Sequence, residues 1–195
     1  MDVNESEKLK DFKKKYFKIA SVHPLYNNIT STNGNIVFGR GSDSPKIVFI
    51  GEAPGQNENK IGKPFVGRSG KLLDNWVSYL SLSENDYCIL NVVPIIPLNK
   101  EKGIRPPTPE EINYFLPLTE KYLELLSPKL IVLLGKSAAS IFDKTLKPGE
   151  TKDYKNTKLF FIYHPSYYLR NGGKGFESSL EKLKTILKEN KNDLK

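Results

Sequence analysis

The sequence is poor in the residues that build disulfide frameworks and metal centres. It holds one cysteine, Cys88, and two histidines, His23 and His164, among 195 residues. A single cysteine excludes an internal disulfide network and any site that needs several cysteines of this chain. Neither histidine has the acidic or cysteine neighbours in sequence that mark a recognisable metal site. We therefore expect no metal and no other cofactor, and a reducing compartment in which Cys88 is a small buried hydrophobic residue.

Long apolar runs are also missing. No stretch approaches the roughly 20 apolar residues of a membrane-spanning helix, and residues 1–18 lack the apolar core of a signal peptide. We expect a monomer without a membrane partner. Its expected location is the cytoplasm, or the nucleus if the source is a eukaryote or a nuclear virus.

Two common nucleotide-binding motifs are absent. Gly135-Lys136-Ser137 follows an apolar run as in a P-loop, but that motif needs a glycine five residues before Gly135, where Leu130 stands. No G-x-G-x-x-G follows any predicted strand. ATP binding and a dinucleotide site are therefore both disfavoured.

Positive charge, in contrast, is in excess. Thirty lysines and arginines against 22 acidic residues give a formal charge of +8, spread over many lysines. Such an excess favours a polyanionic partner, although lysine-rich solvated faces are common and the charge alone does not identify one. The length suits one domain over residues 1–195, with a helical extension at 1–30 and a frayed tail at 188–195.

Strand and helix patterns alternate along the chain. Apolar runs rich in β-branched and aromatic residues predict four buried strands at Lys46–Ile50, Tyr87–Val93, Leu130–Leu134 and Leu159–Tyr163. Apolar residues spaced by three and four predict helices at Glu5–Ala20, from about Ser69 to Leu80, from Pro109 to about Leu126, at Lys136–Phe142 and around Leu180–Leu187. Thr108 is the expected N-cap of the third helix. The alternation indicates an α/β fold, a three-layer α/β/α sandwich with a central four-stranded parallel sheet.

Other stretches are predicted to be irregular. They are Ser21–Ser44, with at most a short strand at Asn35–Phe38, then Pro94–Pro109, Thr145–Asn156 and the segment from His164 to Phe176. Pro94–Pro109 contains five prolines, and a loop of this length inside a compact domain is more often functional than idle.

The segment Gly51–Gly70 reads GEAPGQNENKIGKPFVGRSG. Five glycines and two prolines in twenty residues disfavour a helix or a strand interior and predict a shaped loop. The loop leaves the end of a buried strand, which is where open α/β sheets bind ligands. It is the first candidate for an active site.

Polar residues stand at or near the carboxyl ends of all four predicted strands. Glu52, Asn91, Lys136 and His164 come directly at the strand ends, and the carboxyl ends of parallel strands lie along one edge. We therefore expect a carboxylate, an amide and an imidazole to converge there. Each also has a plainer explanation: a loop histidine with satisfied hydrogen bonds, a strand-end asparagine bound to local backbone, or a carboxylate that braces the loop.

Five segments together resemble the family-four branch of the uracil-DNA glycosylases, the thermostable archaeal and bacterial branch. They are GEAPGQNENKIGKPFVGRSG, Asn91-Val92-Val93, RPPTPEEI from Arg105, LIVLLGKSA and HPSYYLR from His164. The resemblance runs from about Val37 to Arg170. It implies that the partner is DNA containing uracil. It also implies hydrolysis of the N-glycosidic bond to leave an abasic site in base-excision repair, without metal or lyase chemistry.

The resemblance also implies catalytic roles. His164 donates a hydrogen bond towards uracil O2 as negative charge develops, and Asn91 reads the N3–H and O4 edge that distinguishes uracil from cytosine. Glu52 organises the attacking water on the sugar side. Without the resemblance, a strand-end asparagine bound to local backbone would be an equally good explanation of Asn91.

Further roles in binding the base follow from the same resemblance. Phe65 matches the aromatic residue on which uracil stacks, although by itself it would be assigned to the core. Glu58 walls the pocket against the 5-methyl group of thymine. The backbone at Gly51, Ala53 and Gly55 approaches the base and the abasic sugar, which explains the small side chains there.

The remaining implied contacts are with the DNA backbone and the base stack. Tyr168 or Leu169 fills the gap left by the extruded base, and Arg170 meets phosphate or the orphaned strand. Ser69 and Lys71 stand at a helix start, where free N–H groups bind phosphate. Further candidates for phosphate contact are Ser166, Lys100, Lys102, Arg105 and Lys136.

The sequence departs from the family at its metal site. That family usually holds a four-iron cluster on four cysteines, whose positions fall near Ala20 and His23, at Ile95 and at Phe115. Apolar residues at the last two positions suggest that ordinary packing replaces the cluster. The N-terminal segment and the proline-rich loop must then be joined in another way. Asn59 is a second departure, where the family commonly has aspartate.

Three alternative functions remain at this point. One is a protein that binds uracil-DNA, covalently or non-covalently, without turnover. The covalent branch uses a histidine in the loop after the second strand, and 94–109 contains none. A second is a glycosylase of shifted specificity, for hypoxanthine or xanthine. The third is a nucleotide-binding α/β domain with a basic surface and no base release.

Overall fold

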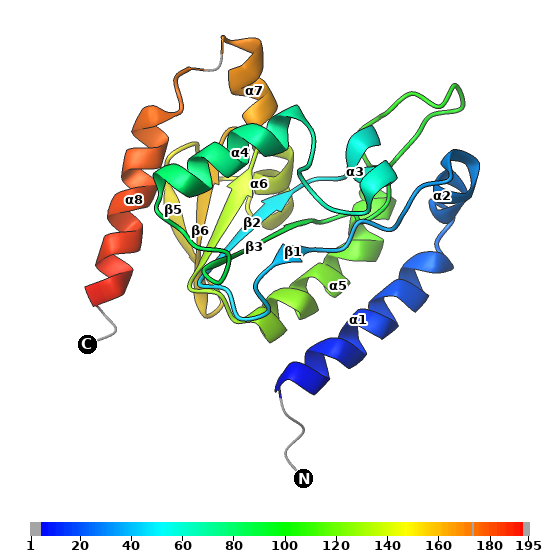
Figure 1. The fold of residues 1–195 in the computed structure, drawn as a ribbon, viewed down its shortest axis with the longest axis horizontal. Coiled ribbons are helices and arrows are strands. Elements are labelled where there is room, and N and C mark those ends of the chain that lie inside the picture. The colour runs from blue at the N-terminus through cyan, green and yellow to red at the C-terminus, as the bar shows by residue number, and fades with distance from the viewer. Residues whose placement is uncertain (1–4, 173, 193–195) are drawn as a thin grey trace.

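A six-stranded sheet runs through the computed structural model of the chain, which describes residues 5–172 and 174–192 (Figure 1). Its strands are β1 Arg40–Gly41, β2 Ile47–Gly51, β3 Tyr87–Asn91, β4 Leu130–Leu134, β5 Thr151–Tyr154 and β6 Thr157–Ile162. Their order across the sheet is β1-β3-β2-β4-β6-β5. The inner four are parallel, and the two edge strands are antiparallel. The predicted α/β fold and its four parallel strands are confirmed.

The inner strands are apolar because helices cover both faces of the sheet. Every residue of β2, β3 and β4 is buried, as are the last four of β6. The register places Gly51 of β2 beside Asn91 of β3. This pairing brings the glycine-rich segment next to the second strand end at the carboxyl edge.

Eight helices complete the described part of the chain. They are α1 Glu5–Ser21, α2 Tyr26–Thr32, α3 Gln56–Ile61, α4 Arg68–Tyr79, α5 Pro109–Leu126, α6 Lys136–Phe142, α7 Pro165–Arg170 and α8 Glu177–Asn192. Figure 1 shows α4, α7 and α8 on one side of the sheet and α1 and α5 on the other. One core cluster contains Trp76, Tyr168 and Leu180, and the other contains Phe12, Phe115 and Ala138. No helix among these residues is long and apolar enough to cross a membrane.

The start of α5 follows its sequence signals. Thr108 caps the helix: its hydroxyl accepts a hydrogen bond from the Glu111 N–H at 3.3 Å, and the Glu111 carboxylate accepts one from the Thr108 N–H at 2.7 Å. Pro109 occupies the first turn, where its missing N–H costs nothing. The predicted N-cap and helix are confirmed.

Three short helices were predicted as irregular segments, and those predictions are wrong. α2 lies within 21–44, α3 within the glycine-rich segment, and α7 directly after His164. The glycines around α3 delimit it: Gly55 is its N-cap, and Gly62 ends it with a φ of 79°. These three helices have fewer apolar residues at helical spacing than Lys136–Phe142, the short helix that the sequence did predict.

The edge strands and the last helix also differ from expectation. β5 lies in the predicted loop 145–156, and the extended residues at the other edge are Arg40–Gly41 rather than Asn35–Phe38. Both edge strands are mostly exposed or half-buried, so they carry no buried-strand pattern. Helix α8 continues to Asn192, and only the last part of the expected frayed tail, 193–195, lies outside the described residues.

Candidate active site

A cleft of about 810 Å³ opens at the carboxyl ends of the parallel strands. Eleven of the residues proposed from the sequence line it: Glu52, Ala53, Gly55, Glu58, Phe65, Ser69, Asn91, Arg105, His164, Ser166 and Arg170. They come from segments as distant as the glycine-rich loop and α7, and parallel topology brings them together. A cleft of this volume suits a small organic ligand. The predicted convergence of a carboxylate, an amide and an imidazole is therefore confirmed.

Seven other proposed residues do not line the cleft. Gly51 lies just beneath it, since a Cβ placed there would be 2.4 Å from the Asn91 Oδ1 and 2.7 Å from the Phe65 Cζ. Tyr168 is 3% exposed and packs against Trp76, with ring centroids 5.6 Å apart. The other five lie outside the lining, with the four lysines exposed and Leu169 half-buried: Lys71, Lys100, Lys102, Lys136 and Leu169.

Asn91 brings an unsatisfied acceptor to the cleft. Its side chain is 5% exposed, and its Oδ1 is buried with no hydrogen-bond partner in the described structure. A buried acceptor left unpaired costs about 1–3 kcal/mol. Asn91 is therefore not explained by bonding to local backbone through that oxygen. A ligand donor at the cleft would satisfy it.

His164 is held in one tautomer. Its Nδ1 accepts a hydrogen bond from the Ser166 N–H at 3.1 Å and lies 2.8 Å from the Ser166 hydroxyl, to which Arg170 donates at 3.3 Å. Burial and the nearby Arg170 charge lower the pKa of His164 to about 4. The ring is thus neutral at pH 7 with its proton on Nε2, a hydrogen-bond donor.

Glu52 supplies the carboxylate of the cleft. Burial raises the pKa of Glu52, and a hydrogen bond from Ser137 of α6 opposes that rise. Unlike the Glu58 carboxylate, the Glu52 carboxylate has no backbone N–H among its described hydrogen-bond partners. Its carboxylate is therefore available to bind water or a sugar.

Glu58 instead braces the loop. Its carboxylate accepts hydrogen bonds from the N–H groups of Gly55, Val66 and Gly67 at 3.1, 3.0 and 2.9 Å. The sequence suggested such a bracing role for Glu52, and the structure gives it to Glu58. These bonds close the glycine-rich loop over α3 and set the wall of the cleft.

Several lining residues were not proposed as site residues. They are Pro54, Gln56, Asn57, Gly67, Arg68, Pro97, Ile104, Pro106 and Pro107. Gln56 and Asn57 lie within the polar, glycine-rich segment, which is a usable sequence signal. Arg68 begins α4 beside Ser69 and adds a cation at the rim. Ile104 is 51% exposed, and no sequence pattern marks it.

Comparison with known proteins agrees with this geometry. The sequence profile of the uracil DNA glycosylase superfamily matches residues 38–189. The chain belongs to this superfamily. It is 36% identical to the type-4 uracil-DNA glycosylase of Thermotoga maritima, over 94% of this chain and 97% of that protein. It is 37% identical to the type-4 uracil-DNA glycosylase of Archaeoglobus fulgidus, over 73% and 76%.

The residues at the expected cluster positions of this superfamily member do not fit an iron–sulfur cluster. Ala20, Ile95 and Phe115 are each 0% exposed, and the His23 ring packs on that of Phe115 at a centroid distance of 4.8 Å. The one cysteine, Cys88, is buried in β3. The positions offer no thiolate, and side chains fill the space. Apolar side chains pack at the positions where the family usually has cysteines that bind the iron–sulfur cluster.

Hydrogen bonds join the segments that a cluster would connect. Asn28 of α2 donates to the carbonyl of Ile96 at 2.8 Å, and the Val37 N–H donates to that of Pro94 at 2.7 Å. The Tyr114 hydroxyl of α5 donates to the Ile19 carbonyl of α1 at 3.3 Å. The N-terminal extension is therefore fastened both to the proline-rich loop and to α5.

Arg105, proposed as a phosphate contact, fixes the proline-rich loop. Its guanidinium makes two bonds to the Glu111 carboxylate, at 2.8 and 2.6 Å, and a third to the Leu98 carbonyl at 3.2 Å. The Glu111 side chain is 12% exposed. A two-bond arginine–carboxylate pair of this kind is geometrically specific and strong. The charge of Arg105 is thus already paired, although its side chain lines the cleft.

Glu111→Gln should destabilise the protein by about 1–3 kcal/mol, because the Arg105 charge loses a matched partner. Burial alone would raise the pKa of Glu111, but Arg105 and the Thr108 N–H lower it on balance. The contribution is accordingly present above the ordinary pKa of Glu111 and is lost as pH falls through the lowered value. Urea unfolding at neutral and acidic pH, followed by Trp76 fluorescence, measures both effects.

Glu124→Gln is the matched control, since Glu124 pairs with Lys121 at 2.9 Å on the same helix but is 68% exposed. That exposed pair should contribute less than about 0.5 kcal/mol. Equal destabilisation by the two variants would contradict the role given to the Arg105–Glu111 pair.

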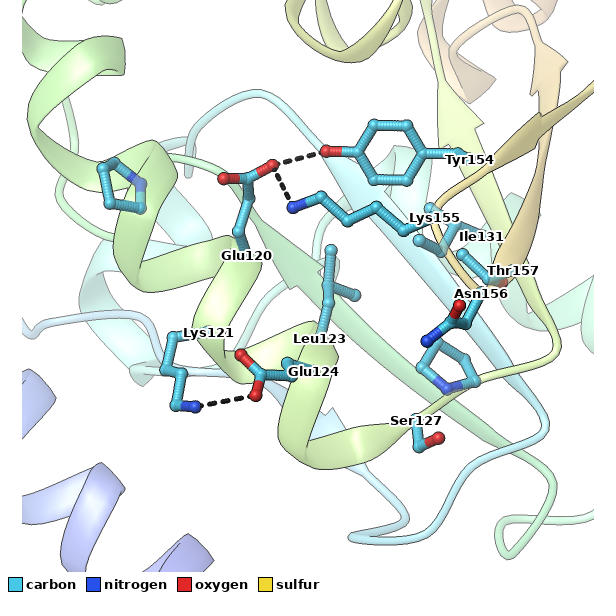
Figure 2. Close-up of a pocket in the computed structure, with 12 residues that line it drawn as sticks. Glu120, Lys121, Leu123, Glu124, Ser127, Ile131, Tyr154, Lys155, Asn156 and Thr157 are labelled. Carbon is cyan, nitrogen blue, oxygen red and sulfur yellow. Dashed lines mark hydrogen bonds and ion pairs between the residues drawn. The ribbon is translucent and has the colours of Figure 1, made fainter.

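A second cavity, of about 420 Å³, lies at the opposite edge of the sheet, near the start of β4 and β6 (Figure 2). Figure 2 shows its charged groups turned toward one another. Glu120 accepts from the Tyr154 hydroxyl and pairs with Lys155 at 2.8 Å. These charges already satisfy each other, and the carboxyl edge of the sheet lies elsewhere. We therefore assign the chemistry to the first cleft.

Proposed function

We propose that this protein is a monofunctional uracil-DNA glycosylase, which hydrolyses the N-glycosidic bond of uracil in DNA and leaves an abasic site for base-excision repair. The observation that carries the proposal is the pairing, in one cleft, of the open Asn91 acceptor with the neutral His164 donor. Uracil presents a donor at N3 and acceptors at O2 and O4. The substrate would be DNA in the cytoplasm, or in the nucleus of a eukaryote.

Base recognition follows from three side chains. The nucleotide is extruded from the base stack into the cleft, which costs a few kcal/mol. Phe65 stacks on the uracil ring; it is 6% exposed, and its ring centroid lies 5.6 Å from that of His164. Asn91 accepts from N3–H and donates to O4. Cytosine has an acceptor at N3 and a donor at C4, so it leaves both groups of Asn91 mismatched.

Bond cleavage needs stabilisation of negative charge on the leaving base. As the bond between C1′ and N1 breaks, its electron pair moves onto the uracil ring and the sugar becomes oxocarbenium-like. The His164 Nε2–H donates to O2, where part of that charge collects. Water held by Glu52 adds to C1′ and gives one proton to the Glu52 carboxylate. The uracil anion takes up one proton from solvent and Glu52 releases one to solvent, which leaves an abasic sugar, free uracil and the enzyme in its starting state.

The DNA contacts lie around the rim of the cleft. Leu169, rather than the buried Tyr168, fills the space left by the extruded nucleotide. Arg170 and Lys136 contact phosphate, as do Ser69 and Lys71 in the first turn of α4. Because these contacts neutralise phosphates, binding should weaken as salt increases, whatever the sequence.

A base-release assay tests the proposal. Single- and double-stranded oligonucleotides that contain one uracil are incubated with the protein in EDTA, then treated with alkali and separated on a gel. We expect alkali-dependent cleavage at uracil and no cleavage before alkali. Hypoxanthine, xanthine and thymine substrates run in parallel to measure specificity, and an SDS gel detects covalent adducts. Absence of uracil release, or a stable adduct without turnover, would refute the proposal.

The loss of rate on the acid side of the pH–rate profile should reflect protonation of Glu52. Burial raises the pKa of Glu52, whereas burial and Arg170 lower the pKa of His164 to about 4. As pH falls, Glu52 is therefore protonated first and loses its hold on the water. Glu52→Gln should be slower by about 10- to 100-fold and should keep a flat profile until pH approaches 4. An unchanged acid limb in the variant would assign that limb to another group.

A further inference from the structure

The backbone that carries Phe65 is bound by a distant arginine. Arg40, on the edge strand β1, donates through Nε to the Pro64 carbonyl at 2.9 Å and through Nη2 to the Phe65 carbonyl at 3.2 Å. The same Nη2 pairs with Asp74 of α4 at 2.7 Å. One guanidinium thus joins an edge strand, the glycine-rich loop and a helix. Neither Arg40 nor Asp74 lines the cleft.

Phe65 needs this support because its backbone is strained. It has a φ of 52°, in the left-handed region that bulky residues rarely adopt, and such strain persists only where the surroundings enforce it. On the N–H side of this segment, the Glu58 carboxylate binds the two residues that follow Phe65. On the carbonyl side, Gly70 leaves room, since a Cβ there would lie 1.9 Å from the Phe65 oxygen.

We propose that Arg40 is a positioning residue that holds the Phe65 ring in register with His164 and Asn91. The inference rests on the proposed function for the role of Phe65 as the surface on which the base stacks. Glu58 fixes the amide side of the segment and Arg40 its carbonyl side. On its other side the ring packs closely over Gly51, since a Cβ there would lie 2.7 Å from the Phe65 Cζ.

Arginine suits this place for geometric reasons. Its planar fork presents several N–H donors in fixed directions, so two carbonyls and one carboxylate are bound at once. Lysine would keep the charge beside Asp74, but a single ammonium at the end of a flexible chain cannot reproduce the fork. Arg40→Lys and Arg40→Gln therefore separate charge from geometry.

The experiment compares Arg40→Gln with the parent protein in uracil release and in folding. We expect kcat to fall by roughly 10- to 100-fold, because a small misplacement of the stacking ring moves the base away from its catalytic groups. KM for DNA should change little, since the phosphate contacts lie at other residues. The kcat of Arg40→Lys should lie between that of Arg40→Gln and that of the parent protein. The melting temperature, followed through Trp76, reports the fold separately.

A readout that does not depend on activity comes from His164. The chain has two histidines, so the imidazole signals of His164 can be assigned by comparison with a His23→Gln protein. The Phe65 ring lies near enough to shift those signals through its ring current, at a centroid distance of 5.6 Å. Displacement of Phe65 in Arg40→Gln should therefore move the His164 resonances.

Lys13→Gln is the matched control. Lys13 pairs with Asp43 at 2.7 Å, with side chains 33% and 61% exposed, against 24% and 52% for Arg40 and Asp74. The Lys13→Gln variant breaks a similar ion pair but removes no contact with the glycine-rich loop. Its kcat and its His164 signals should therefore stay as in the parent protein.

Each outcome decides. Lowered kcat with shifted His164 signals and a retained fold supports the inference. Unchanged kcat and unchanged His164 signals in Arg40→Gln overturn it. It is also overturned if activity falls only in proportion to the fraction of unfolded protein while the His164 signals of the folded protein do not move. Full kcat in Arg40→Lys also overturns it, because charge would then suffice. If the parent releases no uracil yet the His164 signals move in Arg40→Gln, the proposed function fails and the positioning role stands.

Discussion

His164→Ala should lower kcat for uracil release by about 10²–10³, the usual cost of removing one donor to a developing anion. The fall should be in kcat rather than in KM, because the bond to O2 strengthens as charge moves onto the leaving base. Ser166 holds the ring so that Nε2 carries the proton, and burial keeps the ring neutral. Single-turnover assays with saturating protein measure this step directly.

Two variants control for this result. His164→Gln keeps an N–H donor on a side chain that does not titrate, so it should recover part of the rate that alanine loses. His23→Ala removes the other histidine, which packs against Tyr114 and Phe115 and does not line the cleft, and should keep the parent kcat per folded molecule. A His164→Ala protein within tenfold of the parent would show that another group carries the charge.

Much of the site could be predicted because parallel topology places strand ends together. Glu52, Asn91 and His164 are distant in sequence, yet each stands at the end of an apolar strand, and the sheet sets all three at one cleft. Knowing the strands was enough for that convergence. The roles of these residues in catalysis stay predictions.

Side-chain direction could not be predicted without knowing the local backbone. The segment after His164 was predicted to be a loop, in which Tyr168 and Leu169 are equivalent. As helix α7, it sends Tyr168 into the core against Trp76 and leaves Ser166 and Arg170 at the cleft. These side chains point in different directions because the segment is a helix. Six residues are too few to show a helical period in the sequence.

The contacts of Arg40 and Glu58 that support the loop could not be predicted for a different reason. Arg40 was assigned to a turn-rich stretch, and its bonds span 24 to 34 residues of chain. Glu58 was assigned to the pocket wall, although its carboxylate binds backbone amides of its own loop. Such contacts depend on how segments pack, and a local pattern carries no record of them.

Gly51→Ala should reduce kcat by at least about 10²-fold, because the added methyl group displaces the base-recognition residues. Its Cβ would lie 2.4 Å from the Asn91 Oδ1 and 2.7 Å from the Phe65 Cζ, so the amide or the ring must move. Overpacking of this kind also costs about 1–3 kcal/mol of stability. Turnover and urea unfolding should therefore be measured on the same preparation.

Gly34→Ala is the control for Gly51→Ala, because it introduces a clash of similar size at a site outside the cleft. A Cβ at Gly34 would lie 2.2 Å from the Asn59 Oδ1, so the variant also forces an asparagine to move, but Asn59 does not line the cleft. The two variants should lose comparable stability, while Gly34→Ala keeps the parent kcat per folded molecule. Near-normal turnover in Gly51→Ala would mean that the positions of Asn91 and Phe65 beside Gly51 do not set the rate. Base recognition would then have to depend on other residues of the cleft.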